Sequence, residues 1–107
     1  MTEASNRGEI DADEEVVTLD ISGAGAVGAQ LAGTFVGTLQ FEACIENGTF
    51  VALNMTPSDS TTPATSATAT GALSGLCGGY RGFRVRASAW TSGTVRVAIS
   101  SAGSGGK

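Results

Sequence analysis

Apolar and polar side chains alternate with a period of two over much of this chain, and the alternation restricts its fold more than any other feature. In one run the apolar side chains occupy odd positions, namely Phe35, Leu39, Phe41, Ala43 and Ile45. Polar side chains occupy even positions between them, namely Thr38, Gln40 and Glu42. Since successive side chains of a strand point to opposite faces, the pattern predicts a strand with one face in a core and the other in water. Glycine and β-branched residues interrupt every candidate helical stripe, so we expect no helix.

Two hairpins are predicted from the turns between such runs. Asn47-Gly48 separates the first run from residues 50–55 and favours a hairpin, because both residues tolerate the positive φ angles of a tight turn. Thr91-Ser92-Gly93 is expected to turn the chain in a second hairpin. Its inward side chains are Phe83, Val85, Ala87 and Ala89 before the turn and Val95, Val97 and Ile99 after it. Its outer face carries Arg84, Arg86, Trp90 and Arg96.

Weaker strand patterns complete the predicted domain. They cover residues 16–21, 27–31 and 69–76, whereas residues 56–70, rich in Ser, Thr and Ala, are typical of a long exposed loop. Short strands with turns at intervals of roughly 8 to 12 residues are typical of sandwiches. The sequence therefore predicts an all-β fold, a single small antiparallel β-sandwich of immunoglobulin-like or jelly-roll-like type, over residues 15–101.

The two ends of the chain are predicted to lie outside the sandwich. Up to Asp20 the chain carries seven acids against Arg7 alone, and it has few apolar side chains before residue 14. Such a segment cannot bury enough surface to fold alone, so residues 1–14 are expected to form a flexible acidic arm and residues 102–107 a flexible tail. The arm either solubilises the chain or orders on a neighbouring subunit's arginine face. In the second case Asp11, Asp13 and Glu14 are its interface residues.

Composition argues against catalysis. The chain of 107 residues has no histidine, which removes the usual general base and the usual zinc ligand. Gly23 to Gly28 match the spacing of a phosphate-binding glycine loop, but no helix is expected after them. Cys44 and Cys77 belong to no CxxC pair and are expected to be free, buried or half-buried thiols. We therefore expect no enzyme activity, no metal and no cofactor.

The compartment is predicted from two further absences. No apolar stretch approaches the roughly 20 residues of a membrane helix, so no contact with a membrane is expected. The first residues lack the basic start and apolar run of an export signal, which predicts synthesis in the cytoplasm.

The arginines of the second hairpin predict a protein-binding face. Four basic side chains beside one tryptophan also resemble a phosphate track for nucleic acid, but a net charge of −4 opposes that use. We therefore expect these arginines to contact carboxylates of another protein. Trp90 serves either as an anchor of that interface or as a cap on the core. The predicted interface arginines are Arg81, Arg84, Arg86 and Arg96.

Three segments resemble small β-sandwich modules of tailed-bacteriophage virion proteins. They read GTFVGTLQFE (33–42), NGTFVAL (47–53) and YRGFRVRASAWTSGTV (80–95), and the likeness spans about residues 20–101. Asn47 and Phe50 stand where the family more often has Asp and Trp. The resemblance implies a capsid decoration (cement) protein, a homotrimer that binds the major capsid protein on the virion surface.

The same family also suggests an alternative. In other settings such modules belong to a tail, baseplate or fibre, where they bind carbohydrate on the host surface. In this chain Trp90 would then stack on a sugar, with Tyr80 and Asp59 as its helpers. The alternative stays open on sequence grounds.

Overall fold

Eight antiparallel strands form the fold of this chain. The structure is a computed structural model, and it describes residues 4–46 and 49–103. The strands are β1 (Ala4–Ile10), β2 (Val16–Asp20), β3 (Ala24–Cys44), β4 (Phe50–Ala52), β5 (Thr56–Pro57), β6 (Ser66–Ala67), β7 (Gly71–Leu76) and β8 (Gly82–Gly103). Within those two ranges no residue is helical, so the all-β antiparallel prediction is confirmed.

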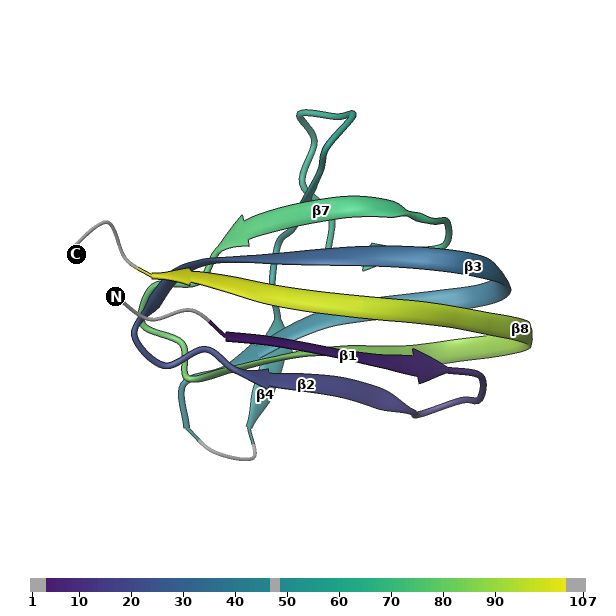
Figure 1. Ribbon diagram of the computed structural model, residues 1–107, viewed down its shortest axis with the longest axis horizontal. Coiled ribbons are helices and arrows are strands. Elements are labelled where there is room, and N and C mark those ends of the chain that lie inside the picture. The colour runs from purple at the N-terminus through teal and green to yellow at the C-terminus, as the bar shows by residue number, and fades with distance from the viewer. Residues whose placement is uncertain (1–3, 47–48, 104–107) are drawn as a thin grey trace.

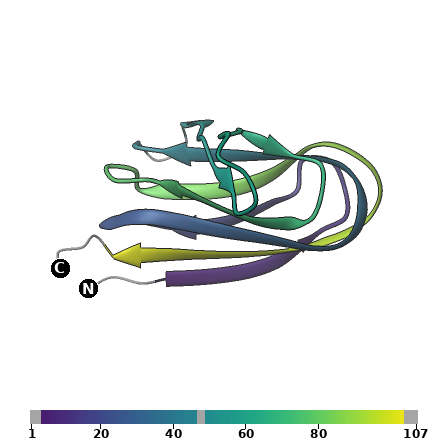
Figure 2. The same cartoon turned by 90° about the horizontal axis from the view of Figure 1, so that it is seen from above.

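Two long strands, β3 and β8, run through the whole molecule. They have 21 and 22 residues and pair with each other from Ala24↔Gly103 to Cys44↔Gly82. Both strands bend back at one end of the molecule, and a view from above shows two layers (Figures 1 and 2). Each long strand therefore contributes one half to each layer of a sandwich.

The short strands define the two layers. In layer A, β1, residues 95–103 of β8, residues 24–33 of β3, β7 and β5 lie side by side. In layer B, β2, residues 82–86 of β8 and residues 39–44 of β3 lie side by side, and β4 and β6 pair with β3. The sandwich is thus one sheet folded over on itself.

The bend depends on glycine and on irregular pairing. Gly33 and Gly93 have φ angles of 115° and 90°, which favour glycine because other residues rarely adopt them. The register of β3 and β8 shifts between Val36 and Gly37 and again between Thr38 and Leu39. Extra residues of this kind increase the local bend of a strand.

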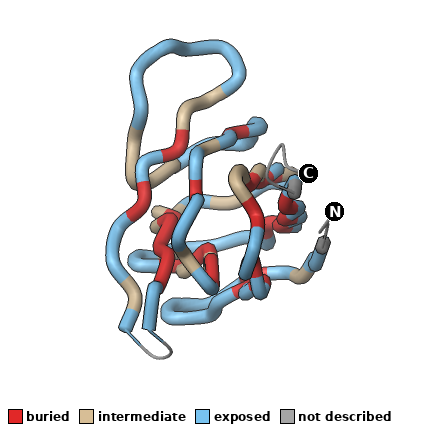
Figure 3. Tube along the Cα trace, turned by 90° about the vertical axis from the view of Figure 1, so that its left-hand side faces the viewer, coloured by how far each residue is buried: buried red, intermediate tan, exposed pale blue. Residues whose placement is uncertain are grey.

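The core lies between the layers. Apolar side chains from both halves of the long strands are fully buried there, and most outer positions are exposed or half-buried (Figure 3). The largest buried side chains are Phe41, Phe83, Ile10, Ile21, Leu31, Leu39, Met55 and Ile99. The inward positions predicted from the alternation, Leu39, Phe41, Ala43, Phe83, Val85, Ala87, Val95, Val97 and Ile99, are all buried. The structure corrects two others, because Ile45 is 64% exposed beyond the end of the core and Ala89 is exposed beside the register shift.

The first predicted hairpin forms, and the second does not. Glu42 pairs with Ala52 and Cys44 with Phe50, while Asn47 and Gly48 lie outside the described residues. The predicted turn at residues 91–93 is wrong, because β8 continues through it as a bent strand. Gly93 accommodates the bend, and the partner of each β8 half is β3 rather than the other half.

The acidic arm is also corrected. Residues 4–10 form β1, which pairs with β8 from Ala4↔Ser101 to Ile10↔Val95, and Ile10 is completely buried. Pairing with β8 supplies the stabilisation that the segment lacks alone. At the other end β8 extends to Gly103, and residues 104–107 of the predicted tail lie outside the described residues.

Candidate binding surfaces

An ion-pair ladder covers the outer face of layer B. Arg84 Nε donates to Glu42 Oε1 at 2.6 Å, and Arg86 Nη2 lies 3.1 Å from Glu42 Oε2. Arg86 Nη1 also lies 3.2 Å from Glu14 Oε1 in the turn between β1 and β2. The register creates this ladder, because Arg84 stands directly opposite Glu42 in the β3–β8 pair. Two carboxylates and two guanidinium groups are thus held together across three elements.

The electrostatics of Glu42 follow from these contacts. Partial burial raises its pKa, but the hydrogen bonds from Arg86 and Arg84 outweigh burial and hold the pKa below its ordinary value. The same hydrogen bond with Glu42 raises the pKa of Arg86. Arg84 also lies over the Phe50 ring, 4.0 Å from its centroid, which adds a cation–π contact.

Two arginines of the predicted protein-binding face pair with acids of the same chain. The structure brings Arg84, Arg86 and Glu14 together with Glu42, and the two positive and two negative charges neutralise one another within the chain. Arg81 is exposed before β8, and Arg96 is exposed on the outer face of layer A. Glu42 was missed as a partner, since its position opposite Arg84 depends on a pairing between residues 42 apart in sequence.

The two remaining predicted interface acids, Asp11 and Asp13, lie in the exposed turn between β1 and β2. The Glu15 carboxylate accepts a hydrogen bond of 2.7 Å from the Asp11 backbone N–H. A side-chain hydrogen bond with Glu15 and repulsion by its charge raise the pKa of Asp11, and the Asp11 backbone lowers the pKa of Glu15. The turn is therefore a concentrated negative surface.

Trp90 braces the bend. Its ring is stacked on Phe35 with centroids 5.3 Å apart, and its Nε1 donates to the Gly93 carbonyl at 3.2 Å. A Cβ placed on Gly37 would come within 2.6 Å of the Trp90 ring, so the indole covers this glycine. Trp90 is partly buried against the core, as a core cap would be, and its role as an interface anchor stays a prediction.

The residues of the carbohydrate alternative do not gather into one site. Tyr80 lies in the loop before β8, where its N–H donates to the Cys77 carbonyl. Trp90 lies at the bend, about eight strand residues or 25 Å further along β8. Asp59 is exposed in the loop between β5 and β6. We find no sugar platform made by these three side chains.

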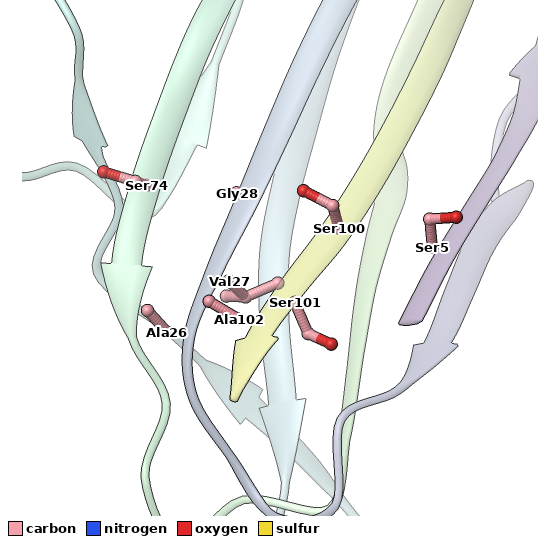
Figure 4. A pocket seen from close by; sticks show the side chains of 8 residues that line it. All are labelled: Ser5, Ala26, Val27, Gly28, Ser74, Ser100, Ser101 and Ala102. Carbon is pink, nitrogen blue, oxygen red and sulfur yellow. The ribbon is translucent and has the colours of Figure 1, made fainter. Parts of the chain in front are cut away.

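Layer A presents a different outer surface, which we call the serine-alanine face. Its central row crosses four strands, with Ser5 opposite Ser100, Ser100 opposite Gly28, and Gly28 opposite Ser74 (Figure 4). Neighbouring strands lie about 4.8 Å apart, so Ser5 and Ser100 are direct neighbours, whereas Gly28 separates Ser100 from Ser74. The rest of the face includes Ala26, Gln30, Ala72, Ala98 and Ala102, and Arg7 lines the second hollow on the β1 side.

The serine-alanine face is hollowed at Gly28. An open hollow of about 670 Å³ lies over the central row, and a second of about 530 Å³ adjoins it, sharing Ser5, Gly28 and Ser100. A Cβ on Gly28 would make only ordinary contacts, 3.6 Å from the Leu73 carbonyl oxygen and 3.9 Å from Ser100 Oγ. The missing side chain therefore creates the hollow without being required by the backbone. Small uncharged side chains gave no chemical signal in the sequence, so this face was not predicted.

The two cysteine side chains are buried. Cys44 and Cys77 are free and buried, as expected, and burial raises the pKa of the Cys77 thiol. Among the described residues no three His, Cys, Asp or Glu side chains come close enough to share a metal ion. In the same part of the chain we find no helix that is long and apolar enough to cross a membrane.

Two prophage-derived proteins of known structure share this fold. The SPBc2 prophage-derived protein YomS superposes with a TM-score of 0.74 at 15% identity, over 95% of this chain and 96% of YomS. The PBSX exported protein XepA gives a TM-score of 0.74 at 18% identity, over 94% of this chain but only 39% of XepA. No protein-family model matches the sequence, and no curated protein matches it at a significant level. At these identities the likeness shows a common fold.

Proposed function

We propose that this chain is a structural protein of a phage particle and that it decorates the capsid by binding the major capsid protein on the outer shell. The observation that carries the proposal is the fold shared with a prophage-derived protein over nearly the full length of both chains. Fold alone does not fix a task, so the capsid role rests on the additional resemblance of the strand and turn motifs to phage virion modules.

The serine-alanine face supports a docking role. It is broad and open and, apart from Arg7 at the second hollow, is lined mostly by short uncharged side chains, so another protein surface can approach the sheet closely with few charges to desolvate. Many copies on one shell would also multiply a modest affinity for each site. We therefore assign the serine-alanine face to the shell.

Cryo-electron microscopy of particles made with and without this chain tests the proposal. We expect density of this size at repeated positions on the shell of complete particles, and its loss when the chain is absent. Particles without the chain should also rupture at a lower temperature. Density confined to the tail or baseplate would favour the carbohydrate alternative, and absence of the chain from purified particles would refute both.

A further inference from the structure

Strand β1 is an edge of layer A. Its seven residues pair with β8 on one side and with no other strand among the described residues. Strand β2 lies beneath β1 on the core side, because a Cβ on Gly8 would lie 3.0 Å from Val17 Cγ2 and Asn6 Nδ2 donates to the Thr18 carbonyl at 2.8 Å. The lateral edge of β1 is therefore a free row of backbone donors and acceptors, which is the usual template for pairing with another strand.

The order of charges along β1 selects a partner. Arg7 and Glu9 flank Gly8, and both charged side chains are exposed on the outer face. When such a strand pairs antiparallel with a copy of itself about Gly8, Arg7 of each chain stands opposite Glu9 of the other. Opposite charges at directly facing positions stabilise an antiparallel pair, and like charges destabilise it. Neither side chain makes an ion pair or hydrogen bond in the part of the chain that the structure describes, although Glu9 stands directly opposite Arg96 in the β1–β8 pair, so both can contact a second copy.

We propose that two copies of this chain associate through their β1 edges, in an antiparallel pairing centred on Gly8 with reciprocal Arg7–Glu9 contacts. This register also keeps inward side chains opposite inward side chains, since Asn6 of one copy faces Ile10 of the other and both lie on the core side of the sheet. A two-fold axis relates the copies, as is usual for a self-complementary interface. The product is one continuous sheet made from two A layers.

The other edges are less suited to such pairing. Strand β7 is partly covered by β5, and β4 has only three residues. Self-pairing of β2 about Thr18 would place Val16 opposite Asp20, with no charge complementarity. Strand β1 is thus the longest uncovered edge and carries the self-complementary charges.

The arrangement has a geometric consequence. A two-fold axis perpendicular to the sheet keeps the outer sides of both copies on the same side, so the two serine-alanine faces become one wider surface. The inference does not depend on the proposed function, and it differs from the trimer that the sequence resemblance implies.

Light scattering on the full chain over a range of concentrations tests the pairing through two charge variants. Arg7→Glu leaves acids at both positions, and Glu9→Arg leaves arginines at both, so each variant alone faces like charges across the two-fold. We expect the wild type to form dimers and each variant to raise the dimer Kd by roughly tenfold to a hundredfold. Circular dichroism checks that both variants keep the fold.

Mixing supplies the decisive measurement. When the two variants are combined in equal amounts, every facing pair is again one acid and one arginine, so heterodimers should form with an affinity near that of the wild type. Glu46→Arg, which reverses an exposed acid outside β1, is the control and should leave the dimer unchanged. The proposal would be overturned if the wild type were monomeric or trimeric, or if neither variant changed the dimer Kd. Failure of the mixture to restore dimers would overturn the Gly8-centred register.

Discussion

Arg84 and Glu42 face each other directly across the β3–β8 pair, and the guanidinium Nε donates a 2.6 Å hydrogen bond to the carboxylate. The carboxylate is largely buried under its two arginine partners, with 11% of its side chain exposed. The buried carboxylate of Glu42 is stabilised by both arginines, and its negative charge in turn reduces the repulsion between them. The ladder is therefore better explained as reinforcement of layer B than as a docking site.

Replacing Glu42 by Gln should destabilise the protein. The substitution keeps the size of the side chain but leaves Arg84 without its counter-charge and Arg86 with only the exposed Glu14, so we expect a loss of about 1–3 kcal/mol in the free energy of unfolding. Urea denaturation followed by circular dichroism measures it. Glu46→Gln, at an exposed acid near the β3–β4 turn, is the matched control and should change the midpoint little. An unchanged midpoint for Glu42→Gln would show that the ion-pair ladder does not contribute to the free energy of unfolding.

Stability should fall in acid in a way that depends on Glu42. Because its pKa in the folded protein lies below the ordinary value of 4.5, the ion pairs contribute fully above that pH and are lost as the pH falls through the folded pKa. The difference in unfolding free energy between wild type and Glu42→Gln should therefore shrink as the pH is lowered from 6 towards about 3. A difference that stays constant over this range would contradict the assigned pKa direction.

The bend should be intolerant of any side chain at Gly93. A Cβ there would collide with the Thr34 carbonyl oxygen and lie 2.7 Å from Phe35 Cα, and the φ angle of 90° adds strain. We expect Gly93→Ala to cost about 2 kcal/mol or more and to alter the fluorescence of Trp90, the only tryptophan, which bonds to the Gly93 carbonyl. Gly78→Ala is the control, since nothing lies within 4 Å of its Cβ position. Equal stability of the two variants would argue against the bend geometry.

Filling the hollow on the serine-alanine face should weaken binding to the shell without unfolding the protein. A Gln at Gly28 begins with ordinary van der Waals contacts and then extends into the hollow between Ser74 and Ser100. We expect sedimentation with empty capsids to drop at least tenfold in affinity, a change of about 1.4 kcal/mol, while the thermal midpoint moves by only a few degrees. Gly78→Gln provides a control outside the face. Undiminished sedimentation of Gly28→Gln would place the capsid contact elsewhere.

The sequence predicted strand structure in β2, β3, β4, β7 and β8 and most of their inward positions because those signals are local, whereas β1, β5 and β6 were not predicted. The alternation that includes Phe41, Phe83 and Val97 depends only on neighbouring residues. Gly93 was misread because a glycine with positive φ serves equally in a tight turn and in a bent strand. Local chemistry at residues 91–93 does not distinguish the two.

The pairing partners could not be predicted in the same way. The run from Phe35 to Ile45 was expected to pair with residues 50–55, its neighbours in sequence, whereas the longest partner of β3 is β8, and no local signal marks a contact such as Ala29 with Ile99. Strand β1 has one large apolar side chain, Ile10, and becomes ordered only through β8. The ladder at Glu42 and the row through Gly28 both follow from this long-range register, so neither was visible in the sequence.

The central place of β8 has a consequence during synthesis. Strands β1 and β2 pair only with β8 among the described residues, and β3 has β8 as its longest partner. A nascent chain that ends before Gly82 can form local hairpins but neither layer. The ribosome must therefore release nearly the whole domain before its first two strands find a partner, and until then their backbones remain open to proteases and chaperones.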